Sequence, residues 1–140
     1  MTAIVKKLAV ALGLAGSAAA ADNALFLRLS PDREDLEAYR WSVRPVLVFA
    51  PDSDDAQYTE QIALLRAAQA GLAERDIVVL TDIAQDEKGR LRAALAVDGF
   101  EVLLVGKDGG VKLRQETPLS VDDLFATIDA MPMRQREMAN

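Results

Sequence analysis

The sequence predicts an α/β fold in three layers, a mixed β-sheet with helices on both of its faces. Two short and uninterrupted apolar runs, 46–50 and 77–80, are typical of strands that are buried on both faces. A long stretch with helical spacing separates them, so we expect a β-α-β unit with parallel strands. A Gly-rich turn at 106–110 joins two further strand-like runs, which predicts an antiparallel hairpin.

The segment before the first of these strands has the features of a helix start. Ser30 is a good N-cap residue, Pro31 suits the first helical position, and acidic residues follow in the first turn. We therefore expect a short helix between Ser30 and Trp41, which leads into the strand over 46–50.

One long helix is predicted between the two parallel strands, from Asp54 to about Arg75. Its apolar residues recur at helical spacing through Ile62, Leu65 and Leu72. This stripe would let the helix lie on one face of the sheet.

The second half of the chain predicts a shorter helix followed by the hairpin. The residues 85–97 have helical spacing and end at Asp98-Gly99. The hairpin strands are expected at about 101–105 and 111–114, with the Gly-rich turn between them.

The last predicted helix begins at Ser120, which resembles the start of a capping box because Asp123 follows three residues later. Pro132 is expected to end this helix. The remaining residues, 133–140, are polar, and we expect them to fray. The predicted order is thus β-α-β and then α-β-β-α.

The first 21 residues have the order of a secretory signal peptide. Lys6 and Lys7 precede an apolar stretch, and small residues follow up to Ala21. The apolar stretch is well short of the roughly 20 residues that a membrane span needs. We therefore expect cleavage after Ala21, no membrane span in the mature protein, and a periplasmic or secreted location.

The mature chain is predicted to be one acidic domain. Residues 22–140 suit the size of a single domain, with a core at about 39–131 and a short polar tail. The chain has 16 Lys and Arg residues against 22 Asp and Glu residues, and a net charge of −6. Nucleic acids and anionic membranes would be repelled. We expect the partner to be another exported or envelope protein.

The chain contains no cysteine and no histidine. Without thiols it can form no disulfide, no thiol redox cycle and no thiolate metal site. Without imidazole it has no Ser-His-Asp or Cys-His catalytic arrangement. The turn at 106–110 lacks the spacing of a phosphate loop, and no cofactor is predicted. These absences favour a binding module over an enzyme.

Acidic residues follow the first parallel strand, where α/β folds often place their chemistry. We expect Asp52 or Ser53 to cap the long helix, with Asp54 and Asp55 in its first turn. The alternative is a site for a divalent metal ion or a small ligand, completed by Asp82 from the end of the next strand. A further alternative is a cysteine-free hydrolase in which Asp52 and Asp82 form the catalytic pair.

Three aromatic residues flank the first parallel strand: Tyr39, Trp41 and Tyr58. Core or edge packing is the ordinary role of such side chains. If they are exposed together, they would form an anchor for a protein partner. The arginines at 44, 66, 134 and 136 are expected on the solvated surface.

Three blocks of the sequence carry a family resemblance: "RWSVRPVLVFAP", "GFEVLLVGKDGGVKLR" and "DAMPMRQREM". They span residues 39–138 and resemble the P-DUDES family, a domain of unknown function (number 4174) found in exported bacterial proteins and in secreted vertebrate proteins. The resemblance implies a thioredoxin-like three-layer fold and supplies no catalytic residues.

This chain departs from redox-active proteins of the thioredoxin-like fold in two places. Those proteins carry Cys-x-x-Cys where this chain has 53–56, and a cis-proline where it has Phe100-Glu101. Together with the signal peptide and the missing catalytic residues, this predicts an exported, redox-inactive thioredoxin-like module for binding or protein interaction, of unknown partner.

Overall fold

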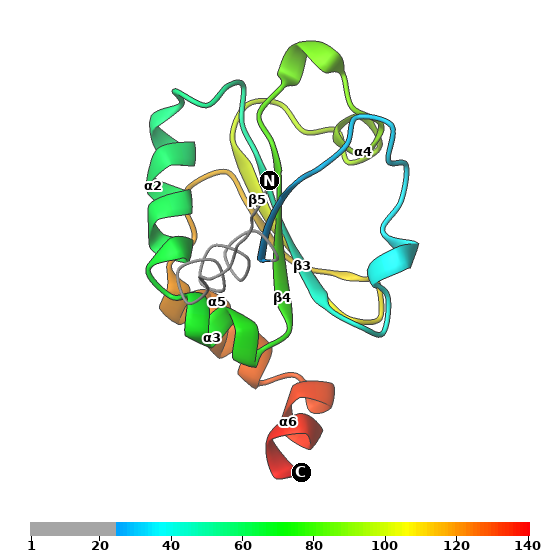
Figure 1. The fold of residues 1–140 in the computed structure, drawn as a ribbon, viewed down its shortest axis with the longest axis vertical. Helices are drawn as coiled ribbons and strands as arrows, with labels where there is room; N and C mark the ends of the chain where they lie inside the picture. The colour runs from blue at the N-terminus through cyan, green and yellow to red at the C-terminus, as the bar shows by residue number, and fades with distance from the viewer. Residues whose placement is uncertain (1–24) are drawn as a thin grey trace, which may run out of the picture.

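The computed structural model describes residues 25–140, which form a five-stranded mixed sheet of order β2-β4-β3-β5-β6 (Figure 1). β4 pairs in parallel with both β2 and β3, whereas β5 pairs antiparallel with β3 and with β6. The predicted parallel crossover and antiparallel hairpin are thus confirmed. The strands are β2 (Phe26–Arg28), β3 (Arg44–Phe49), β4 (Ile77–Asp82), β5 (Glu101–Val105) and β6 (Val111–Gln115).

Helices cover both faces of the sheet, which confirms the predicted α/β class. Two packing clusters show the layers: α2, α3 and α5 contribute to one, and α4 with the segment before β3 contributes to the other (Figure 1). Within the part of the chain that the structure describes, no helix has the length and apolarity needed to cross a membrane. The helices are η1 (Glu37–Tyr39), α2 (Ala56–Arg66), α3 (Gln69–Glu74), η2 (Gln85–Glu87), α4 (Arg90–Ala94), α5 (Val121–Asp129) and α6 (Pro132–Ala139).

The core forms because alternate residues of each central strand point to opposite faces. Val46 and Val48 of β3 pack in the cluster under α2, α3 and α5. Leu47 and Phe49 pack in the cluster on the other side. All four side chains are fully buried. The apolar run is uninterrupted because β3 has a helical layer on each side.

The segment before β3 does not form the predicted short helix. The Oγ atom of Ser30 accepts a hydrogen bond from the amide of Asp32, and the carbonyl of Pro31 accepts one from Arg90. These contacts bind the segment to the start of α4, so only the 3₁₀ turn η1 forms. The short edge strand β2 was not predicted, because three residues carry no periodic pattern.

The predicted long helix is divided into α2 and α3 at Ala67 and Ala68. Neither a proline nor a glycine stands at the break, so no local signal predicts it. A Cβ atom on Gly71 would lie 2.5 Å from the ring of Phe125 in α5. The break is thus followed at once by a close contact between α3 and α5.

The predicted helix over 85–97 is also shorter than expected. It consists of the turn η2 and the short helix α4. Lys88 lies between them with φ at +50°, a left-handed conformation that interrupts a helix.

In the C-terminal part, the predicted helix start at Ser120 is confirmed, and the prediction that the tail frays is wrong. The Oγ atom of Ser120 accepts a hydrogen bond from the amide of Asp123, as a capping box requires. The tail does not fray: it forms α6, with Pro132 in the first turn of that helix. Arg134 of α6 is 4% exposed, so the helix is held by a buried charged residue.

Candidate binding site

The acidic residues after β3 start a helix, but with a different cap from the predicted one. The Oδ1 atom of Asp55 accepts a hydrogen bond from the amide of Tyr58 at 2.9 Å, which makes Asp55 the N-cap of α2. Asp52 instead accepts a hydrogen bond from the amide of Asp54 at 2.9 Å. This turn delays the helix, so neither Asp52 nor Ser53 is the cap. Ser53 and Asp54 lie exposed.

Asp82, at the end of β4, forms an ion pair of its own. Its Oδ1 atom lies 3.0 Å from an Nη atom of Arg92, and both side chains are less than 10% exposed. Arg92 also donates to the carbonyl of Ala50 at 2.9 Å. The pair therefore fastens the ends of β3 and β4, a role for Arg92 that no sequence pattern indicated.

No candidate metal centre emerges at this end of the sheet. Across residues 25–140, no group of three or more His, Cys, Asp or Glu side chains could hold a metal ion. Asp52, Asp55 and Asp82 instead make the hydrogen bonds described above.

The three aromatic residues do not form one surface. Tyr58 packs against the cluster under α2, and Tyr39 packs against the cluster on the other face of the sheet. Only Trp41 is largely solvent-exposed, at 60%. Trp41 precedes β3, whereas Tyr58 lies beyond its far end.

The backbone conformation of Trp41 and the exposure of its ring are both unfavourable for a purely structural residue. Its φ angle is +67°, a left-handed conformation that is rare for a bulky side chain and costs free energy. Its amide donates to the carbonyl of Lys107 at 2.6 Å, which holds it against the turn of the hairpin. Its ring faces solvent, with the guanidinium of Arg40 at 5.2 Å from the ring centre. After the same turn, Val111 is also 50% exposed.

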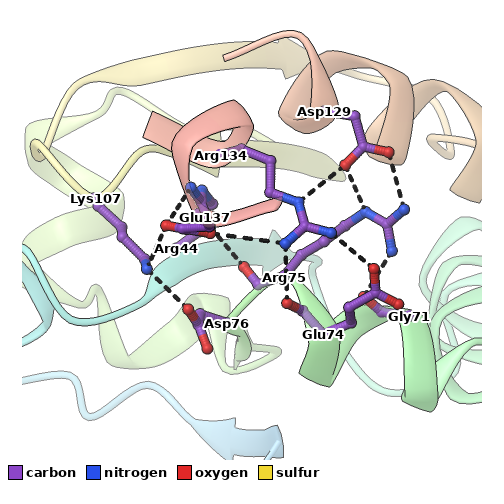
Figure 2. Close-up of polar contacts among 9 residues, drawn as sticks. All are labelled: Arg44, Gly71, Glu74, Arg75, Asp76, Lys107, Asp129, Arg134 and Glu137. Carbon is purple, nitrogen blue, oxygen red and sulfur yellow. Dashed lines mark hydrogen bonds and ion pairs between the residues drawn. The ribbon is translucent and has the colours of Figure 1, made fainter. Parts of the chain in front are cut away.

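Below this turn, charged side chains join β3, the hairpin and α6 (Figure 2). Arg44 is 1% exposed, and its guanidinium donates to both carboxylate oxygens of Glu137 at 3.1 and 3.2 Å. Lys107 donates to Glu137 and to Asp76, each at 2.8 Å. The prediction that Arg44 lies on the solvated surface is therefore wrong. No sequence pattern indicated its burial, because its partner comes from a tail that was expected to fray.

A second group of ion pairs fastens α6 to α3 and α5 (Figure 2). Arg134 donates to Asp129 at 3.2 Å and to the carboxylate of Glu74 at 2.8 Å. Arg75 donates to both oxygens of Asp129 at 2.9 and 3.0 Å. The predicted surface position of Arg134 is thus also wrong, whereas Arg136 and Arg66 are exposed as expected.

The shifted pKa values follow from these contacts. Burial raises the pKa of Glu137, but hydrogen bonds from Arg44 and Lys107 outweigh it and hold the pKa below its ordinary value. Burial lowers the pKa of Lys107, and its hydrogen bonds to Asp76 and Glu137 produce a net increase. A hydrogen bond from Arg75, assisted by one from Arg134, lowers the pKa of Asp129. These contacts thus favour the charged forms of Glu137, Lys107 and Asp129.

A cavity of about 260 Å³ opens beside this network, between the hairpin turn and the start of α6. Its basic wall consists of Arg44, Lys107, Lys112 and Arg136. The Nε atom of Arg44 has no hydrogen-bond partner in the described chain. This end of the molecule thus combines an exposed tryptophan, a basic cavity and a network of ion pairs. We take it as the candidate binding site.

Comparison with known families agrees with this fold. Residues 35–137 match the family model described as "Domain of unknown function (DUF4174)". The chain belongs to this family. The match includes β3, the hairpin and nearly all of α6, so the candidate site lies within the DUF4174 domain.

Curated relatives carry a similar segment within much longer proteins. The chain is 28% identical over 134 residues to coiled-coil domain-containing protein 80 of Danio rerio, which covers 74% of this chain and 16% of that protein. It is 25% identical over 121 residues to Sushi repeat-containing protein SRPX2 of Rattus norvegicus, covering 74% and 26%. The chain thus spans only a small part of each relative.

Solved structures support the thioredoxin-like fold. Chloroplastic thioredoxin z superposes with a TM-score of 0.58 at 21% identity, covering 76% of this chain and 96% of that one. Thioredoxin peroxidase I of Plasmodium yoelii gives a TM-score of 0.58 at 17% identity, covering 72% and 79%. The DUF4174 domain of this chain has that fold without any cysteine. The Phe100–Glu101 peptide bond, at the position where redox-active proteins of the fold carry a cis-proline, is trans.

Proposed function

We propose that this chain is an exported, thiol-independent binding module that holds another exported or envelope protein at the hairpin end of its sheet. The observation that carries the proposal is Trp41, which is 60% exposed and has a φ angle of +67°. Backbone strain in a bulky residue costs free energy and is concentrated at functional sites. An exposed aromatic side chain that is held in place is typical of a binding hot spot.

The alternative sites at the other end of the sheet receive less support. Asp52 and Asp55 accept hydrogen bonds from backbone amides, and Asp82 is paired with Arg92. A metal ion or a hydrolytic mechanism would need these carboxylates free of such partners. We therefore do not assign a metal site or an enzymatic activity to this end.

Export is part of the proposal and rests on the first 21 residues. The expected signal peptide lies outside the described residues, so its support is the order of charged, apolar and small residues in the sequence. An exported protein without cysteine would work independently of the redox state of its compartment.

Site-specific photo-cross-linking in cells that export the chain tests the proposal. A photoreactive phenylalanine analogue is introduced at Ser42, beside Trp41, or at Ser53, where redox-active members of the fold carry their thiols. Both serines are exposed, which makes them a matched pair. Irradiation should give a discrete adduct from position 42 and none from position 53.

Adding Trp41→Ala to the variant labelled at position 42 should reduce that adduct about tenfold or more, as expected for a hot spot. Adducts from position 53 alone would overturn the proposal. So would an adduct from position 42 that does not depend on Trp41.

A further inference from the structure

We infer that the cavity between the hairpin turn and α6 binds the C-terminal carboxylate of an extended peptide whose last residue is apolar. The inference rests on the proposed function, because the cavity adjoins Trp41 through Lys107 and would receive one part of the same partner. It specifies which chemical feature of that partner is recognised.

The charge of the cavity wall favours an anion. Four basic side chains line the cavity, and Asp108 is the one acidic lining residue. The chain as a whole has a net charge of −6, so a cavity lined mainly by basic side chains is unusual on it. An acidic group would therefore be attracted to this place in particular.

Several of the donors around the cavity are not used by the fold. Among the described residues, the side chain of Arg136 makes no hydrogen bond or ion pair, whereas the unpaired Nε atom of Arg44 is fully buried. Lys112 has three donors, and its one side-chain partner is Asp108 at 2.9 Å. A carboxylate can accept several hydrogen bonds at once, and charge-assisted ones are the strongest.

The start of α6 adds backbone donors to the same wall. Met131, the N-cap residue, makes no side-chain capping bond, and Pro132 has no N–H group. The amides of Met133 and Arg134 therefore have no partner within the helix. Met131, Pro132 and Met133 line the cavity, so the positive end of the helix dipole lies at its wall.

The size and the apolar wall select the kind of anion. A cavity of about 260 Å³ is slightly smaller than the range for drug-sized ligands and suits a single terminal residue. Two methionines and a proline offer an apolar and adaptable surface for its side chain. A sulfate or phosphate group would make no use of this surface.

The edge of the sheet shows why a peptide is favoured over a free small acid. β6 is an outer strand of the sheet, and Lys112 lies both in β6 and in the cavity wall. An exposed edge strand can pair with an incoming extended chain. A peptide whose last residue occupies the cavity could therefore continue along β6.

Titration of the purified, exported protein followed by amide chemical shifts tests this inference. The probe is an N-acetylated pentapeptide that ends in leucine with a free carboxylate. The same peptide with a C-terminal amide, and sodium sulfate, are the comparison ligands. We expect shifts over 106–112 and 133–136 with the free acid, and binding about tenfold weaker for the amide.

Two variants and a control assign the contact. Arg136→Gln and Lys112→Gln should each weaken binding of the free acid about five- to tenfold. Lys88→Gln makes the same change of charge at an exposed position that does not line the cavity, and it should leave binding unchanged.

Equal binding of the acid and the amide would overturn the inference, as would the absence of shifts. Sulfate that binds as tightly as the peptide would overturn the peptide assignment in favour of a general anion site. If cross-linking from position 42 persists in these cases, the proposed function stands without this inference. If cross-linking itself fails, the proposed function fails.

Discussion

At the scale of single residues, two kinds of side chain occupy unusual environments. Arg44, Arg92 and Arg134 are nearly buried, and each is paired with a carboxylate. Such pairs are seldom needed for stability alone, because desolvation offsets much of the attraction. Trp41 is the opposite case, an apolar side chain left in solvent in a strained conformation. We interpret the arginines as support and Trp41 as the exposed contact.

If Trp41 serves binding and not folding, the fold should not need it. Trp41→Asn relieves the left-handed strain, because asparagine tolerates this conformation, and it loses only a cation–π contact at an exposed site. Unfolding in urea should show an unchanged free energy or an increase of up to about 1 kcal/mol. Tyr58→Asn, in the partly buried packing under α2, should instead lose about 2 kcal/mol or more. A comparable loss from Trp41→Asn would mean that Trp41 is structural.

The acids that begin α2 provide a matched pair of variants. Asp55→Ala removes the N-cap that accepts from the amide of Tyr58, and should cost about 1 kcal/mol in thermal or chemical unfolding. Asp54→Ala removes an exposed carboxylate with no side-chain bond to the described chain, and should change stability by less than about 0.5 kcal/mol. Equal effects, or a saturable gain in stability with Ca²⁺ or Mg²⁺ that Asp54→Ala abolishes, would contradict this account.

At the scale of elements, the sequence predicted those strands and helix starts that depend on residues close together along the chain. β3 and β4 could be predicted because a short, uninterrupted apolar run between turn residues is typical of a strand buried on both faces. The cap of α5 could be predicted because Ser120 and Asp123 form it alone. The break between α2 and α3, and the helix α6, depend on contacts with residues far along the chain. A sequence pattern does not show these contacts.

The candidate site was only partly predictable for the same reason. The sequence singled out Trp41 but could not show that Tyr39 and Tyr58 pack on opposite faces. The basic cavity could not be predicted, because Arg44 and Arg136 are 92 positions apart in the sequence and line one cavity only when α6 docks.

The docking of α6 should depend on pH through Glu137. Because its pKa is lowered in the folded state, its contribution to stability is present above its ordinary pKa of 4.5 and is lost as the pH falls through the lowered value. At pH 7, Glu137→Gln should reduce the free energy of unfolding by about 1–3 kcal/mol, because Arg44 would lose its charged partner.

The difference between Glu137→Gln and the wild type should shrink in denaturation curves measured below pH 4.5. Glu60→Gln, at an exposed position without a side-chain partner in the described chain, is the control and should show little effect at any pH. A difference that is constant from pH 7 to pH 3 would contradict the role given to Glu137.

At the scale of the whole molecule, a thioredoxin-like framework carries its candidate site at the end opposite to the usual thiols. At the end of the sheet where redox-active proteins of this fold carry cysteines, Asp82 and Arg92 form a buried ion pair. The opposite end is cross-linked by ion pairs and presents Trp41 and a basic cavity. The acidic chain as a whole repels anions, whereas the basic side chains around this cavity attract them.

If the chain is exported as proposed, its first 21 residues should be removed. Mass spectrometry of the protein recovered from the periplasm or the medium should show an N-terminus at Asp22, since cleavage is expected after Ala21. Replacing Leu12 and Leu14 in the apolar stretch by Asp should retain the full-length chain in the cytoplasm. An intact N-terminus on the exported protein would contradict cleavage, and retention of the wild type in the cytoplasm would contradict export.

The central claim is that a partner covers the hairpin end of the sheet. Hydrogen–deuterium exchange of the protein, alone and in complex with the partner recovered by cross-linking, tests it most directly. We predict slower exchange in the complex over 106–112 and 131–136, with no change over 52–58. Protection confined to 52–58 would contradict the account and return the binding site to the position of the missing thiols.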